Sequence, residues 1–288
     1  MAILTGINTR LRGSTGDWTF SQLNGQTIAK QKVAKKGTPR RTMAIMRRRC
    51  RWANIINLYK KFEGNLHPSF EGKKPTLSDF NAFVSANMSL GEGIYLKKAE
   101  AEMGGCVVMP YQVTRGSLPS VSVTLGDDNV TTDIQVGGYT VDEHSMLGEF
   151  SQAIVSNNPG FQDGDQITVF NAVQSIDPVT GVPSVQIIAA EVTLDSYDEE
   201  TTLYDLPGVD ASTFASVNRT LGIARPVKGG IAYVHSRKTQ SKTLVSTQRF
   251  VCDNELIDQY NHNNALFKSI ESYGGLNDEQ FLTPNVAA

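Results

Sequence analysis

The chain has 288 residues, 40% of them hydrophobic, which is enough to bury a sizeable core as one large domain or two ordinary ones. Its formal net charge of −2 conceals a strong separation: residues 1–62 carry fourteen Lys and Arg against one acid, whereas residues 63–288 carry thirteen against twenty-eight Asp and Glu. No run of eighteen apolar residues occurs and the first residues lack the layout of a signal peptide, so we expect no membrane span and a soluble protein made in a cytosol.

Residues 1–37 are expected to form an extended arm that contains a β-hairpin. Trp18 and Phe20 alternate with polar residues in the manner of a strand. Asn24-Gly25 is the residue pair that a type I′ turn favours, because both central residues of that turn need a positive φ. A lone two-stranded ribbon is marginally stable in water, so the arm should lie against a neighbour, with Trp18 and Phe20 as apolar anchors.

Residues 38–105 are predicted to be helical. Thr38-Pro39 reads as an N-cap followed by proline at the first helical position, and a helix can continue from there to about Phe62. On a helical wheel an apolar stripe contains Ile45, Trp52, Ile55, Tyr59 and Phe62, widened by Met43, Met46, Cys50, Ala53 and Ile56. Shorter helices are predicted at about Leu77–Asn87 and over Ile94–Met103, the latter ended by Gly104-Gly105.

Residues 106–252 are predicted to form a β-rich domain. Short runs of Val, Ile and Thr alternate there with Gly, Pro, Asn and Asp. We expect strands at Val107–Val113, Val121–Leu125, Thr131–Val136, Gln166–Ala172, Val185–Leu194, Gly230–His235 and Leu244–Cys252, and a helix within Glu143–Asn157. Residues 253–288 are predicted to form a C-terminal helix that ends at Gly274-Gly275, followed by a tail. The fold class is therefore α+β: an N-terminal β-hairpin arm and helices, then a mainly antiparallel β barrel or sandwich with a C-terminal helix.

Residue patterns typical of a catalytic or metal site are missing from the sequence. The four histidines are scattered, the acid clusters lack the glycine and distal glutamate of a calcium loop, and no serine lies in a Gly-x-Ser-x-Gly elbow. The acid cluster Asp163-Gly164-Asp165 is interpreted as a solvated turn. We therefore predict no catalytic residue, no cofactor, no metal, no small-molecule substrate and no enzyme activity.

Arginines dominate the predicted long helix, and their partner can be of three kinds. The run Arg47-Arg48-Arg49-Cys50-Arg51 could follow phosphates, bind an acidic protein surface or bind the acidic body of another copy, and a merely solvated face is a further alternative. No base-reading module is visible, so any DNA contact would be to the backbone. The residues that we assign to this interface are Arg40, Arg41, Arg47, Arg48 and Arg51, together with Trp18 and Phe20.

A set of glycines and helix-start residues carries a resemblance to a known family. The set comprises Gly13 and Gly16, the hairpin glycine Gly25, the basic stretch Lys30–Lys36, Thr38-Pro39 with Thr42, and an aromatic end at Phe62 and Phe70. With these residues the first seventy positions resemble an uncharacterised protein family of Bacteroidetes and their phages, with relatives among the virion proteins of crAss-like phages. Members more often carry Asn-Pro-x-Thr, where this chain has Thr38 in place of the asparagine.

The charge separation and the resemblance together predict a bacteriophage virion structural protein, in particular a ring or head-tail connector subunit of the neck or tail. Such a protein is located in the virion and assembled in the bacterial host cytoplasm. Its basic N-terminal region would bind the acidic body of adjacent copies in a homo-oligomeric ring, or neighbouring virion proteins. Two alternatives stay open: a capsid decoration or head-fibre protein, and a non-specific DNA-binding packaging protein.

Overall fold

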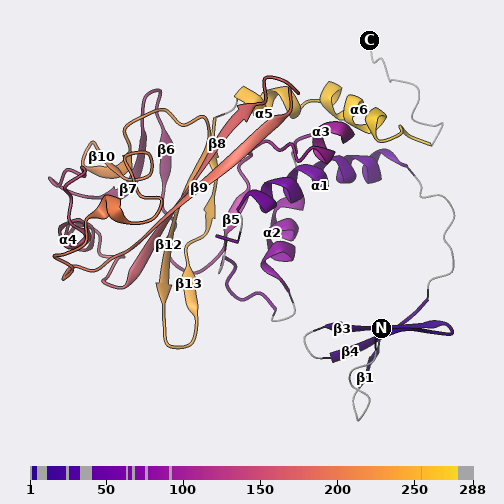
Figure 1. Cartoon of the computed structure of the whole chain (residues 1–288), viewed down its shortest axis with the longest axis horizontal. Helices are drawn as coiled ribbons and strands as arrows, with labels where there is room; N and C mark the ends of the chain where they lie inside the picture. Colours follow the sequence, from indigo (N-terminus) through magenta and orange to yellow (C-terminus); the bar gives the residue numbers. More distant parts are fainter. Residues whose placement is uncertain are drawn as a thin grey trace.

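The computed structural model of the chain describes residues 2–4, 12–23, 26–32, 41–62, 64–66, 69–74, 77–90, 93–253 and 255–277. It shows a small N-terminal sheet, a helical end and a β-rich end (Figure 1). The predicted α+β class is confirmed. The sheets of the described part are open and antiparallel, so the sandwich rather than the barrel is the architecture that the chain adopts.

The N-terminal sheet has four antiparallel strands in the order β1-β4-β3-β2. They are β1 (Ala2–Leu4), β2 (Gly13–Thr15), β3 (Trp18–Leu23) and β4 (Gln26–Gln31). Leu23 pairs with Gln26, which confirms the predicted hairpin, although Asn24-Gly25 lie outside the described residues. The arm is therefore a small sheet rather than a single ribbon, and Figure 1 shows it set apart from the body of the molecule.

The helical end contains helices from both ends of the described chain. They are α1 (Met43–Lys61), α2 (Asp79–Met88), α3 (Lys98–Glu102), α5 (Glu255–Tyr260) and α6 (Asn263–Ser272). The first helix begins later than predicted, because Thr42 is its extended N-cap and accepts a hydrogen bond from the Ile45 N–H; Thr38-Pro39 lie outside the described residues. The predicted single C-terminal helix is two helices, and Gly274 and Gly275 end the second with positive φ, as predicted.

Among the described residues, the β-rich end contains two larger sheets, a pair of short strands, one α-helix and one short 3-10 helix. A four-stranded sheet has the order β10-β11-β7-β6, and a five-stranded sheet has the order β13-β12-β8-β9 with β15 beside β12. The elements are β5 (Gln112–Thr114), β6 (Val123–Leu125), β7 (Val130–Gln135), α4 (Leu147–Asn157), β8 (Asp165–Ile176), β9 (Pro183–Thr193), η1 (Leu203–Asp205), β10 (Ala215–Val217), β11 (Thr220–Ile223), β12 (Gly229–Lys238), β13 (Thr243–Val245), β14 (Gln248–Arg249) and β15 (Val251–Cys252).

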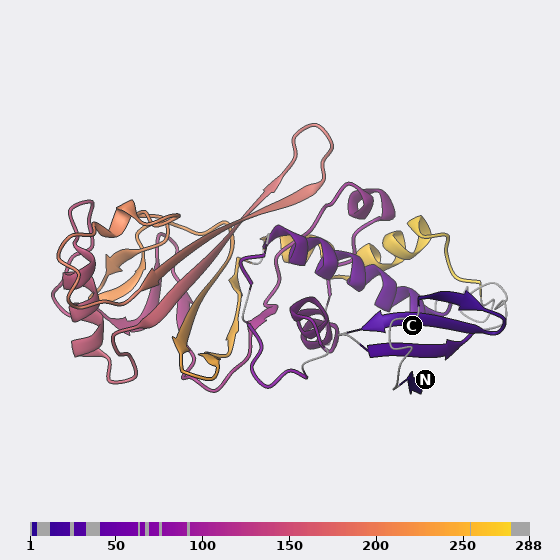
Figure 2. The same cartoon turned by 60° about the horizontal axis from the view of Figure 1, so that its bottom comes forward.

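The long strands β8, β9 and β12 form a wall between two hydrophobic cores. In β8, Val169 belongs to the core of the β-rich end, whereas the next residue, Phe170, belongs to the core under the helices. In β12, Tyr233 belongs to the core of the β-rich end and Ala232 to the core under the helices, because successive side chains of a strand point to opposite faces. Figure 2 shows the β8–β9 ribbon crossing the middle of the molecule, with helices on one side and the smaller sheet on the other.

Buried asparagines join the helices to the chain that leads into the wall. The Asn54 side chain accepts a hydrogen bond from the Val107 N–H at 2.8 Å and donates to the Val107 carbonyl at 2.9 Å. Asn87 contacts the backbone N–H and carbonyl of Gln112 in the same two-way manner. These side chains satisfy the backbone groups of Val107, which lies in irregular chain, and of Gln112, the first residue of β5, so the helical end is fixed in orientation against the wall.

Candidate interaction surface on the arginine helix

The α1 helix buries most of the predicted apolar stripe, including Ile55 and Phe62, but two members of the stripe are exposed. Its buried side includes Met46, Cys50 and Asn54, whereas Ile45 and Trp52 are 50% and 42% exposed. The predicted stripe therefore placed Ile45 and Trp52 on the wrong side of the helix. The structure leaves a surface on α1 in which large apolar side chains alternate with arginines.

Two of the predicted interface arginines form hydrogen bonds to backbone carbonyls of the same chain. Arg41 donates from Nη1 to the Gly274 carbonyl at 2.5 Å, at the end of α6. Arg51 donates from Nη2 to the Met88 carbonyl at 3.2 Å and to the Leu90 carbonyl, at the end of α2. Carbonyls at a helix C-terminus lack intrahelical partners and carry partial negative charge, so these two cations stabilise helix ends.

The remaining arginines of α1 face outward. Arg47 is exposed and donates from Nε to the Tyr95 hydroxyl at 3.1 Å. Arg48 is exposed and forms no hydrogen bond or ion pair with another described residue. Arg49, which the sequence interpretation did not select, lies with its guanidinium carbon 5.7 Å from the centre of the Tyr273 ring. Arg40 lies outside the described residues, so the outward-facing predicted cations are Arg47 and Arg48.

An open hollow of about 570 Å³ lies between the start of α1 and the end of α2. Met43, Ala44 and Met88 give it an apolar lining, and Arg47, Arg48 and Arg51 add three guanidinium groups. We call it the arginine hollow. Its combination of apolar lining and positive charge suits a ligand that presents an apolar group next to acids.

Trp18 and Phe20 lie in the N-terminal sheet and not beside the arginines. Both belong to β3, two residues apart and therefore on one face of the strand. Trp18 is 47% exposed and Phe20 is half-buried. The structure thus splits the predicted contact residues between two places, the sheet and α1, which stand apart in Figure 1.

Acidic residues concentrate at the end of the molecule opposite α1. Residues 117–227 contain sixteen Asp and Glu against two Arg, a formal charge of −14. This segment includes α4, β7 and β10, which Figure 1 shows at the far end from the start of α1. It also includes the β8–β9 hairpin, whose turn, with Asp177, reaches the helical end beside Gly105, so most but not all of the acids lie far from α1. The charge separation along the sequence is therefore also, for most of the acids, a separation in space.

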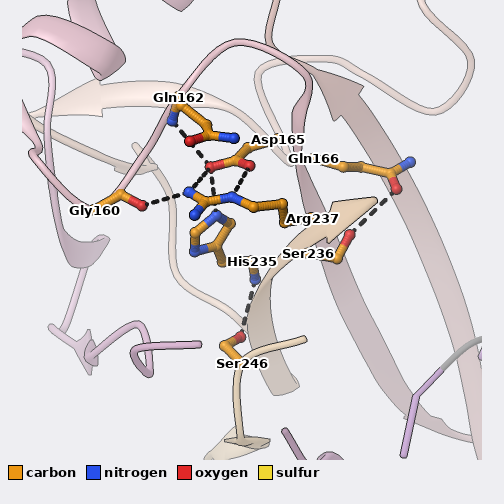
Figure 3. A network of polar contacts seen from close by, with 8 residues as sticks. All are labelled: Gly160, Gln162, Asp165, Gln166, His235, Ser236, Arg237 and Ser246. Carbon is orange, nitrogen blue, oxygen red and sulfur yellow. Dashed lines mark hydrogen bonds and ion pairs between the residues drawn. The ribbon is translucent and has the colours of Figure 1, made fainter. Parts of the chain in front are cut away.

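Asp165 is the centre of a buried polar network in this acidic segment (Figure 3). Its carboxylate accepts hydrogen bonds from Arg237 Nε at 2.6 Å and from the Gln162 N–H at 3.0 Å, and it contacts His235 Nε2 at 2.8 Å. The Asp165 side chain has no solvent exposure. The prediction that this acid cluster is simply a solvated turn is therefore wrong for Asp165.

The Asp165 network does not have the geometry of a Ser-His-Asp nucleophile. The Ser246 hydroxyl accepts a hydrogen bond from the backbone N–H of His235 at 3.0 Å, not from its ring. The His235 ring is stacked on Phe161 with centroids 4.1 Å apart and is 1% exposed. A catalytic group must reach a substrate, so the arrangement serves to tie the loop before β8 to strand β12.

Metal and membrane features are also missing from the described residues. No group of three or more His, Cys, Asp or Glu among them is arranged to hold a metal ion. None of the helices within the described ranges is long and apolar enough to cross a membrane.

Comparison with known proteins gives no relative. No protein-family model matches the chain, and neither a curated protein nor a solved structure matches it.

Proposed function

We propose that the chain is a structural subunit of a homo-oligomer, a ring or connector at the neck or tail of a phage particle. In this proposal the basic helical end of one copy binds the acidic β-rich end of the next copy. The observation that carries it is the opposition of charge at the two ends of the molecule, with −14 on residues 117–227 and exposed arginines on α1. The virion setting draws on the resemblance of the first seventy residues.

A contact between unlike ends has a geometric consequence. When different surfaces of identical copies meet, each added copy leaves one basic and one acidic end available, and the series closes into a ring when the rotation between neighbours divides a full turn. Opposite charge also speeds the encounter and disfavours basic-to-basic or acidic-to-acidic contacts. The two ends therefore attract each other and also fix the direction in which copies are added.

Backbone binding to DNA is the alternative that a specific observation favours. Arg48, Arg49 and Trp52 are exposed on the same helix, and cations with an aromatic side chain are a common combination in sequence-independent nucleic-acid binding. The acidic segment gives no advantage to such a protein, because its charge repels phosphate. We therefore prefer self-assembly.

Mass in solution tests the proposal. We expect light scattering after size-exclusion chromatography to show an oligomer of defined mass at low salt, formed without DNA and dissociating as salt rises. Arg48→Glu should weaken it, whereas Lys238→Glu, an equal charge change at an exposed position on β12, should not. A monomer that binds a non-specific duplex would overturn the proposal in favour of DNA packaging, and a monomer inert to DNA would favour decoration of the capsid.

A further inference from the structure

We propose that an exposed tyrosine in the acidic end of one copy inserts into the arginine hollow of the next copy, with two adjacent glutamates pairing with its arginines. The residues are Tyr197, Glu199 and Glu200. This inference rests on the proposed function and names the contact that would join neighbouring subunits.

The loop that carries Tyr197 is held firmly at its base. The Leu147 N–H donates to the Thr201 carbonyl at 2.9 Å, and the Asp195 N–H donates to the Ser151 hydroxyl at 2.9 Å, so both ends of the loop are attached to α4. Tyr197 nevertheless has 86% of its surface exposed. A large aromatic side chain on a fixed loop loses little conformational entropy when it is buried by a partner, which is the property of an interface anchor.

The acids of the loop divide into two groups. Asp198 accepts hydrogen bonds from the Glu200 N–H, the Thr201 N–H and the Thr201 hydroxyl, and these bonds lower the pKa of Asp198. Its carboxylate is thus committed to the loop itself. Glu199 and Glu200 are exposed, and their carboxylates accept no hydrogen bond from another described residue. Two carboxylates beside Tyr197 are therefore available to cations of another molecule.

The arginine hollow offers the matching chemistry. Met43 and Met88 provide polarizable thioethers, which contact aromatic rings favourably. Its volume of about 570 Å³ lies within the range of pockets that hold organic side groups, roughly 300–1,000 Å³. Arg48 is exposed and forms no polar bond with another described residue, so it can pair with a carboxylate. A phosphate backbone would leave the apolar lining without a partner, whereas a tyrosine flanked by glutamates uses both features.

The two halves of this contact cannot meet within one copy. The loop at 195–201 is attached to α4, and the hollow lies at the start of α1; Figure 1 shows α4 and α1 at opposite ends of the body. The contact therefore forms only between copies, and each copy supplies one half to each neighbour.

A mixing experiment tests the inference because the halves lie on different surfaces. One variant carries Arg47→Glu and Arg48→Glu and so has a disabled hollow. The other carries Tyr197→Ala, Glu199→Gln and Glu200→Gln and so has a disabled loop, with no new positive charge that could pair with the glutamates of the first variant. We expect each variant alone to associate about tenfold or more weakly than the unmodified chain. Mixed in equal amounts, they should form a dimer and nothing larger, because only one productive contact remains.

Controls separate this inference from the proposed function. Val179→Ala changes a side chain that is 92% exposed on the β8–β9 turn, and it should leave the oligomer unchanged. Circular dichroism and thermal unfolding check that each variant folds. If both variants assemble like the unmodified chain, the contact lies elsewhere and the inference fails while the oligomeric subunit stands. If the unmodified chain itself is monomeric at every salt concentration, the proposed function fails and the inference falls with it.

Discussion

Asp165 is a buried residue whose ionised carboxylate is stabilised by side chains from a strand distant in the sequence. Burial by itself would raise the pKa of this carboxyl, but hydrogen bonds from Arg237 and His235 outweigh it and hold the pKa below the ordinary value of 3.8. A folded pKa below the unfolded one means that the carboxylate stabilises the fold above pH 3.8. That contribution is lost as the pH falls from 3.8 through the folded pKa.

Replacing Asp165 with Asn should be strongly destabilising at neutral pH. The amide keeps the shape but leaves the Arg237 guanidinium half-buried without its anion, a change that costs about 3–5 kcal/mol in buried pairs. Urea unfolding at pH 7 measures the loss, and a pH series should show that the variant loses less additional stability below pH 3.8 than the unmodified chain does. Asp128→Asn, in an exposed turn, is the control and should stay within about 0.5 kcal/mol. Equal stability of the two variants would contradict the assigned role.

The burial of Asp165 could not be predicted from the sequence. The segment Asp163-Gly164-Asp165 has the composition of a solvated turn, and nothing nearby signals a cationic partner. Its partners His235 and Arg237 lie about seventy residues later. The antiparallel pairing of β8 with β12 places Arg237 directly opposite Asp165 and His235 two positions along β12. Register between strands so distant is not encoded by local composition.

At the scale of elements, the cationic helix and part of its buried face were predictable, but the exposure of Ile45 and Trp52 and the burial of two asparagines were not. The wheel for α1 counts Asn54 and Asn57 as polar and therefore as exposed. Both are buried, because Asn54 bonds to Val107 and Asn57 donates to the carbonyls of Ala101 and Gly105. The buried face is thus defined partly by hydrogen bonds to the end of α3 and to the irregular chain after it, which hydrophobic periodicity does not register.

The long strands of the wall were predicted closely. The predicted runs Gln166–Ala172, Val185–Leu194 and Gly230–His235 coincide closely with β8, β9 and β12, because runs rich in Val and Ile between turn residues are typical of core strands. In contrast, most of Val107–Val113 is irregular chain that passes beneath the helices, and strand structure begins only at Gln112. Apolar composition there indicated burial correctly, but not the conformation of the backbone.

Gly222 in β11 is expected to tolerate no side chain. A Cβ atom at this position would lie far inside van der Waals distance of the Val130 carbonyl oxygen in the neighbouring strand β7. Backbone cannot rotate away, so Gly222→Ala should cost about 1–3 kcal/mol or more through overpacking. Chemical denaturation checks this, with Gly138→Ala as the matched control because no atom lies within 4 Å of the added Cβ there. An equal effect of the two substitutions would show that β11 and β7 can separate without loss.

At the scale of the whole molecule, the shared wall predicts one cooperative unfolding transition for the body. The helical core and the β-rich core both use β8, β9 and β12, so neither can unfold while the other keeps its packing. Native-state hydrogen exchange should give the same opening free energy for segments 54–62 and 130–136, which represent the two cores. A lower value for either segment would mean that one core opens independently. The N-terminal sheet serves as the internal comparison, because it contributes to neither core.

The shared wall also constrains how the sequence can evolve. Phe170 packs against Phe62 from α1 with ring centroids 5.4 Å apart, whereas its neighbour Val169 faces the other core. A volume change at position 170 must be compensated among the helices, and one at position 169 must be compensated in the β-rich end. Selection on two adjacent codons therefore depends on packing in separate halves of the molecule. Substitutions at position 170 should arise together with substitutions at position 62, whereas those at position 169 should arise independently of them.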